Sequence, residues 1–129
     1  MCLPEPPSLN KWTRIWRGRV LLSREARAYK ETARQLALFA RLTCVEKPAL
    51  VGVRIVWYRS RKVGDLDNRL KIVLDALRGV MYDDDSQIDE LHAWRQDDPD
   101  QKGTVMVTVW PKTSKGPHWT GNGFNVEMR

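Results

Sequence analysis

Residues 64 to 90 read GDLDNRLKIVLDALRGVMYDDDSQIDE, and this stretch decides the fold. After the turn residue Gly64, leucines and a valine recur at helical spacing, which predicts a helix from about Asp65 to Arg78. Gly79 ends this helix, because glycine enters a left-handed conformation at little cost. The charged side chains of the helix lie opposite its leucines, so we expect a polar face that points away from the core.

Two groups of carboxylates frame this helix. Asp65 and Asp67 lie at its head, and the run Asp83-Asp84-Asp85 follows its end. Mg²⁺ prefers oxygen ligands and usually takes one or two carboxylates together with substrate phosphate, so the two groups indicate a cation site if the fold returns the run to the helix head. The alternative is structural: Asp65 caps the helix, Asp67 pairs with Lys71 four residues on, and the run is a solvated loop.

Length and composition favour one globular domain. The chain has 129 residues, of which 42% are hydrophobic and 29% are charged. No apolar run approaches the roughly 18 residues of a membrane span, and no signal peptide pattern begins the chain, so we expect a cytoplasmic protein that meets no membrane. The two cysteines, Cys2 and Cys44, fit neither a disulfide framework nor a metal motif.

Charge is distributed unevenly along the chain. The net charge is +6, but residues 1 to 62 carry 14 Lys and Arg against 4 Asp and Glu, whereas residues 63 to 100 carry 4 against 11. A basic surface attracts a polyanion, yet bare carboxylates repel the phosphates of that polyanion. Bound divalent cations reconcile these two properties. The pattern therefore favours a metal-dependent site that acts on nucleic acid.

Two basic segments are candidates for contact with DNA. The segment KWTRIWRGR, from 11 to 19, interleaves two tryptophans with cations, which suits phosphate binding combined with stacking. The run RSRK, from 59 to 62, directly precedes the acidic helix. The candidate DNA-binding residues are Lys11, Arg14, Arg17, Arg19, Arg59, Arg61 and Lys62. The alternative is that the tryptophans belong to the core and the cations are merely solvated.

The remaining pattern predicts the other elements. We expect a helix that opens at Ser23, and three strands of which the last two pair as an antiparallel hairpin; the proline-rich start is extended and can add an edge strand. The expected bounds are Ser23 to Leu42, Leu50 to Tyr58, Gln87 to Arg95 and Thr104 to Trp110. This order predicts an α+β domain over 1–110, with two helices packed on one small mixed β-sheet. Residues 111–129 are expected to form a loosely held tail.

Three motifs together resemble a known family. They are PPSLNKW…RGR…S…AY near the start, then DLDNRLKIVLDAL, then DDDSQI, and they resemble the RusA-type Holliday junction resolvases over about residues 4 to 110. The resemblance implies a homodimer that requires Mg²⁺, for which Mn²⁺ can substitute. It also implies symmetric paired nicks in a four-way DNA junction, during recombination and repair in a bacterial or phage-infected cell.

The resemblance also assigns roles to single residues. The metal-binding aspartates of the family fall on Asp65, Asp67 and Asp85, with Asp84 as their neighbour, and its lysine falls on Lys71. Asn68 and Asp75 match positions that we expect to be supporting or structural, and the lone histidine near the site, His92, is expected to be structural. The extra Asp83 leaves open which members of the run are ligands.

With one or two Mg²⁺ ions held by these aspartates, Lys71 would orient water or contact the scissile phosphate. Other functions remain open from the sequence. They are a nuclease for other branched DNA such as flaps, a catalytically inactive junction-binding or DNA-binding protein, and a protein that docks a basic partner on its acidic face.

Overall fold

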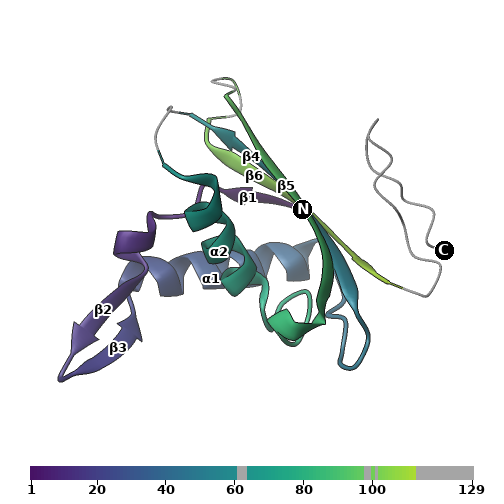
Figure 1. The fold of residues 1–129 in the computed structure, drawn as a ribbon, viewed down its shortest axis with the longest axis horizontal. Helices are drawn as coiled ribbons and strands as arrows, with labels where there is room; N and C mark the ends of the chain where they lie inside the picture. Colours follow the sequence, from purple (N-terminus) through teal and green to yellow (C-terminus); the bar gives the residue numbers. More distant parts are fainter. Residues whose placement is uncertain (61–63, 98–99, 101, 113–129) are drawn as a thin grey trace.

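The computed structural model describes residues 1–60, 64–97, 100 and 102–112. In chain order the elements are β1 (Cys2–Pro4), η1 (Leu9–Lys11), β2 (Thr13–Trp16), β3 (Arg19–Leu22), α1 (Arg24–Phe39), β4 (Val51–Arg59), α2 (Leu66–Leu77), η2 (Asp85–Gln87), β5 (Ile88–Asp97) and β6 (Thr104–Pro111). Both long helices lie on one side of the main sheet (Figure 1). The predicted α+β fold with two helices on a small mixed sheet is confirmed.

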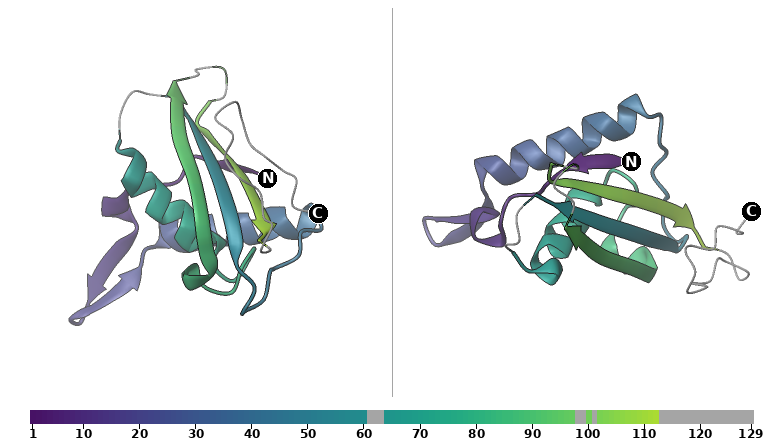
Figure 2. Two further views of the ribbon diagram at one scale, coloured as in Figure 1. Left: turned by 45° about the vertical axis from the view of Figure 1, so that its right-hand side comes forward. Right: turned by 90° about the horizontal axis from the view of Figure 1, so that it is seen from above.

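The main sheet has the strand order β1-β6-β4-β5, and β2 and β3 form a separate hairpin that projects from the body (Figures 1 and 2). The central strand β4 is buried along most of its length. Val51, Val53, Ile55 and Trp57 are at most 1% exposed and belong to the core that the helices cover. The expected edge strand at the start of the chain is present as β1, which pairs antiparallel with β6.

The predicted hairpin between the last two strands is wrong. β6 pairs antiparallel with β4, and β5 pairs parallel with β4 on its other side. The reason is the position of α2, which carries the chain from the end of β4 back across the sheet, so that β5 begins where β4 begins. β4, the most apolar strand, therefore separates the two strands that the sequence pattern joined.

The bounds of α1 agree with the sequence prediction more closely at the start than at the end, and those of α2 differ from it by one residue at each end. α1 begins after Ser23, whose Oγ accepts a hydrogen bond from the Ala26 N–H at 3.0 Å, as the capping prediction requires. This helix ends at Phe39 rather than at Leu42. Within the described residues, no helix is long and apolar enough to cross a membrane. The predicted tail falls mainly on 113–129, which lie outside the described residues.

Candidate metal and DNA site

The carboxylates of Asp65 and Asp67, at the head of α2, are exposed and make no ion pair within the described residues. Asp65 occupies the N-cap position, but its side chain makes no capping hydrogen bond and only accepts one from Asn68 Nδ2 at 3.4 Å. Asp67 lies in the first turn, and within the described residues neither Asp67 nor Lys71 has a hydrogen-bond or ion-pair partner. The structural alternative of a capping Asp65 and an Asp67–Lys71 ion pair is therefore not what the structure contains.

A polar pocket adjoins this helix head, and we call it the α2-head pocket. The segment around η1 forms one wall and the first turn of α2 forms the other; the lining residues are Ser8, Asn10, Gly64, Asp65, Asn68 and Arg69. Every side chain in this lining can donate or accept a hydrogen bond. A pocket of this chemistry suits the phosphate, sugar or base edge of a nucleotide better than an apolar ligand.

Arg69 is a site residue that sequence reasoning missed. Its guanidinium lies 5.3 Å from the ring centroid of Trp57 and donates a hydrogen bond to the Pro6 carbonyl. Trp57 is itself fixed, because its indole N–H donates to Glu5 Oε2 at 2.8 Å. Gly64 has a φ of +94°, and a Cβ there would lie 3.2 Å from Trp57 and 3.3 Å from Arg69, so the glycine lets this cluster close.

Gln87, the glutamine of the motif DDDSQI, fixes the acidic run through hydrogen bonds. The side chain of Gln87 is 2% exposed; it accepts a hydrogen bond from the Asp84 N–H at 2.8 Å and donates to the carbonyls of Val45 and Ala49 at 3.0 and 2.8 Å. Asp84 completes a capping box at the start of η2. The motif glutamine therefore positions the run, a role that its spacing from Asp84 could have indicated.

The carboxylates of Asp83 and Asp84 already interact with Lys47. The Asp83 carboxylate accepts a hydrogen bond from the Lys47 N–H at 3.0 Å. The pKa of Asp84 is lowered, first by the hydrogen bond from the Ser86 hydroxyl and also by the Lys47 ammonium 3.6 Å away. Asp85 is exposed, and its carboxylate has no hydrogen-bond or ion-pair partner within the described part of the chain. Asp85 is thus the member of the run whose carboxylate is most available to a ligand.

The two carboxylate groups lie at opposite ends of α2. Twelve residues of helix span about 18 Å, and η2 follows the end of α2 that lies away from Asp65 (Figure 1). Within the described residues, no three His, Cys, Asp or Glu side chains are close enough to hold a metal ion together. The return of the run to the helix head, on which the predicted cation site depended, is not seen within a single chain.

The donor chemistry nevertheless fits a hard divalent cation. Asp65, Asp67 and Asp85 offer carboxylate oxygens only, and all three are exposed.

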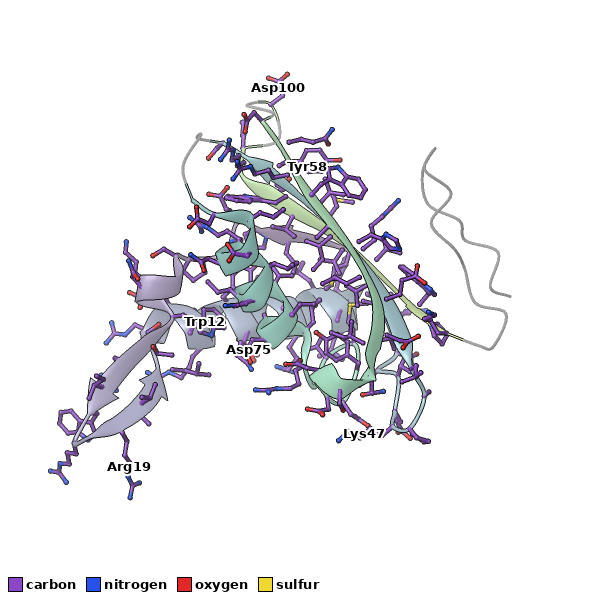
Figure 3. The ribbon with its side chains drawn as sticks, in the orientation of Figure 1. Trp12, Arg19, Lys47, Tyr58, Asp75 and Asp100 are labelled. Atoms are coloured by element: carbon purple, nitrogen blue, oxygen red, sulfur yellow. The ribbon has the colours of Figure 1, made fainter. Side chains whose placement is uncertain are left out.

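Asp75, predicted to lie on the outer polar face, instead lies against the core: its Oδ2 accepts from Trp12 Nε1 at 3.1 Å, and Lys30 donates to its backbone carbonyl at 3.2 Å (Figure 3). Asp75 is therefore a structural residue that joins α2 to α1.

The basic segment before α1 divides into a core part and an exposed part. Trp12 is 5% exposed and packs edge-on against Tyr29, with ring centroids 6.3 Å apart. Trp16 is 55% exposed on β2, and the Arg17 guanidinium lies 5.4 Å from its ring centroid. The exposed part belongs to the β2–β3 hairpin, which turns at Arg17 and Gly18, both with positive φ.

The other predicted DNA contacts have different surroundings. Lys11, Arg14, Arg17 and Arg19 are exposed, and Arg19 lies on the projecting hairpin (Figure 3). Arg59 pairs with Asp97 and lies against Trp57. Arg61 and Lys62 fall outside the described residues. His92 lies 2.6 Å from Glu90 on β5, a contact in keeping with the structural role expected for it.

Comparisons with known proteins identify the family of this chain. The profile of the family described as Endodeoxyribonuclease RusA matches residues 4–110. The chain is also similar to the Crossover junction endodeoxyribonuclease RusA of Shigella sonnei (strain Ss046), with 35% identity over 88 residues that cover 67% of this chain and 72% of that protein. A match of this extent shows the family, and the chain is therefore an endodeoxyribonuclease that belongs to the RusA family.

Proposed function

We propose that this protein resolves four-way DNA junctions by symmetric paired nicks, in a Mg²⁺-dependent reaction that serves recombination and repair. The observation that supports this function best is the pair of uncommitted carboxylates, Asp65 and Asp67, beside the polar α2-head pocket. A binding protein has no use for bare carboxylates next to phosphate, because they repel it. The name of the Shigella sonnei relative supports the choice of a junction as substrate.

The metal would be held by Asp65, Asp67 and Asp85, with Asp84 as a neighbour. Bound there, Mg²⁺ or Mn²⁺ supplies a polarised phosphate and a water of lowered pKa. The protein contributes the rest. Lys71, one turn beyond Asp67 and exposed, holds the attacking water or the scissile phosphate, while Arg69 and the amides of the α2-head pocket bind the neighbouring nucleotide.

The projecting hairpin contacts the DNA outside the pocket. Arg14, Arg17 and Arg19 take phosphates, and the exposed indole of Trp16 stacks on a base or sugar. Arg59, Arg61 and Lys62 are proposed as further phosphate contacts. Because such contacts carry charge rather than sequence information, they favour DNA in general, and selectivity for a junction needs a second copy of the site.

The proposed homodimer supplies that second copy and also joins the two acidic groups. A two-fold dimer presents two equivalent sites to a four-way junction that is itself roughly two-fold. Within one chain Asp67 lies in the first turn of α2, whereas Asp85 lies after the opposite end of the helix. We therefore propose that the helix head of one chain lies against the acidic run of its partner, so that each metal site takes ligands from both chains.

Two other functions are compatible with parts of this geometry. A nuclease for flaps or other branched DNA would use the same carboxylates but would not need paired nicks. A catalytically inactive DNA-binding protein would use only the hairpin and its cations. Metal dependence and the number of nicks per junction separate these candidates from the proposed resolvase.

The proposal is tested with an end-labelled synthetic four-way junction, beside linear duplex of the same sequence, in Mg²⁺ or EDTA. The wild type should cut opposing strands near the crossover in Mg²⁺ only. Asp67→Asn should still retard the junction on a gel but should lose cleavage by at least about 100-fold, while Asp89→Asn, a change at an exposed aspartate of β5, should cut normally. A wild type that binds junctions but cuts none in Mg²⁺ or in Mn²⁺ would contradict the proposal.

A further inference from the structure

Two arginines lie against the buried ring of Trp57, and their guanidinium groups differ in what they bind. The Arg59 guanidinium is 5.9 Å from the ring centroid, and its Nε and Nη2 both donate to the carboxylate of Asp97. The Arg69 guanidinium is 5.3 Å from the same centroid. Nε and Nη2 form one edge of a guanidinium, whose two parallel N–H groups fit a carboxylate or a phosphate. Arg59 therefore shows this edge occupied by an anion.

The same edge of Arg69 has no partner among the described residues. A guanidinium has five N–H donors, and the structure accounts for one of them in Arg69, which Nη1 donates to the Pro6 carbonyl. Arg69 is partly buried and makes no ion pair within the described part of the chain. Its Nε–Nη2 edge is therefore able to accept an anion from outside the chain.

The Arg69 guanidinium is held in place before any ligand arrives. One of its faces lies against Trp57, and its Nη1 is bound to the carbonyl of Pro6. Pro6 is buried, and the carbonyl of nearby Pro4 accepts a hydrogen bond from the Tyr29 hydroxyl at 2.8 Å, so the segment that holds Nη1 is itself anchored. A fixed arginine binds an anion with little further loss of side-chain freedom.

Gly64 leaves the Nε–Nη2 edge of Arg69 uncovered. A Cβ at position 64 would lie 3.3 Å from Nε and 3.4 Å from Nη2, so any other side chain would lie next to both donors. Gly64 and Arg69 both line the α2-head pocket. A ligand in that pocket can therefore approach this edge.

The edge is also close to the candidate metal ligands. The Arg69 N–H donates to the Asp65 carbonyl at 3.2 Å, so the two residues are one helical turn apart, and Asp65 lines the same pocket. Side chains at this spacing are neighbours on one face of a helix. A DNA strand whose scissile phosphate is held at the aspartates would then bring its next phosphate to Arg69.

We propose that the Nε–Nη2 edge of Arg69, which we call the Arg69 fork, binds the DNA phosphate next to the scissile one. This inference rests on the proposed function and names the group that Arg69 takes from the neighbouring nucleotide, which is its phosphate and not its sugar or base. Such a contact fixes the register of the strand at the metal site without reading the bases.

The test replaces single phosphates of the junction with uncharged methylphosphonates. One position around the crossover is changed at a time, in both opposing strands, and junction affinity is measured in EDTA. The nick is mapped separately in Mg²⁺ on the unmodified junction. For the wild type, the change next to the nick should weaken binding by about 10- to 100-fold, because a charged hydrogen-bonded pair is lost. The flanking positions should have clearly smaller effects.

Three variants show whether this response belongs to the Arg69 fork. Arg69→Gln can still donate to the Pro6 carbonyl, but it should bind the unmodified junction more weakly and lose the response to the methylphosphonate. Gly64→Ala keeps the arginine, covers its edge and should lose the response as well. Arg34→Gln is the matched control, because Arg34 is exposed on α1 and pairs with Glu31; it should respond as the wild type does.

The results that overturn the Arg69 fork differ from those that overturn the resolvase. If no single phosphate stands out, or if Arg69→Gln or Gly64→Ala responds like the wild type, the fork is wrong, while a junction cut by paired nicks keeps the proposed function. A wild type that binds junctions and cuts none overturns the proposed function, yet a response that Arg69→Gln abolishes still supports the fork as a DNA contact.

Arg69→Lys repeats the test if Arg69→Gln fails to fold. Lysine keeps the positive charge but lacks the two parallel donors, so its response should be weaker than that of the wild type. A response of wild-type size in Arg69→Lys would mean that charge alone, and not the fork, binds the phosphate.

Discussion

Replacing Gln87 by leucine should be among the most destabilising single changes near the acidic run. Leucine is similar in size to glutamine but makes no hydrogen bond, so the change removes the bond from the Asp84 N–H within the run and the two bonds that join Gln87 to the loop after α1. The Asp84 N–H and the carbonyls of Val45 and Ala49 then lose their partner. All of this occurs around a side chain that is 2% exposed.

The expected loss of stability depends on how many of these polar groups can form hydrogen bonds with water after the substitution. Ala49 is exposed, so its carbonyl can turn to solvent, whereas Val45 and Asp84 are partly buried. Two unsatisfied groups at about 1–3 kcal/mol each give a loss of about 2–6 kcal/mol in the free energy of unfolding. For a chain of this length, that corresponds to a fall in Tm of about 8–24 °C.

The assay is thermal and urea unfolding followed by circular dichroism. Gln35→Leu is the matched control, because Gln35 is exposed on α1 and bonds only to Glu31; its stability should change by less than about 0.5 kcal/mol. The native state of Gln87→Leu should also cut junctions poorly at low temperature, since the run is no longer fixed. A loss below about 1 kcal/mol for Gln87→Leu would refute the view that this glutamine holds the run.

Two further changes test other parts of the fold and the site. Gly52→Ala should lower the free energy of unfolding by about 1–3 kcal/mol or more, because a Cβ at this position overlaps the buried ring of Trp110. Urea unfolding measures this loss of stability. A neutral result would mean that the strands β4 and β6 separate easily. The pKa of the Cys44 thiol is raised by burial and by the Asp83 carboxylate, so Asp83→Asn should lower that pKa, increase the thiolate fraction at pH 8 and speed alkylation; an unchanged or slower rate would contradict the assignment.

Periodicity predicted the elements that bury a regular apolar face. The central strand β4 and the helix α2 match their expected ranges within one or two residues, since their patterns report burial directly. Strand pairing was not predictable in the same way. Whether β6 lies beside β5 or beside β4 depends on contacts across the whole sheet, and neither strand carries a local signal of its partner.

The sequence names the candidate acidic residues but not how they are assembled. Their separation along α2 depends on where η2 lies after the turn, which no spacing rule provides. Trp12 and Trp16 lie in the same basic segment, and only the tertiary fold places one in the core and the other on an exposed hairpin. Arg69 was missed because a charged residue on a helix gives no sign that it stacks on a strand tryptophan.

The central claim is that the helix-head aspartates and the acidic run form one catalytic site, shared by two chains. It is tested most directly by mixing Asp67→Asn and Asp85→Asn, each inactive alone, and measuring nicking of a four-way junction in Mg²⁺. Half of the dimers are then mixed and each has one intact site, so the mixture should nick at about a quarter of the wild-type rate and leave single rather than paired nicks. Asp67→Asn mixed with Asp65→Asn should remain inactive, and an Asp67→Asn and Asp85→Asn mixture that also stays inactive would contradict the shared site.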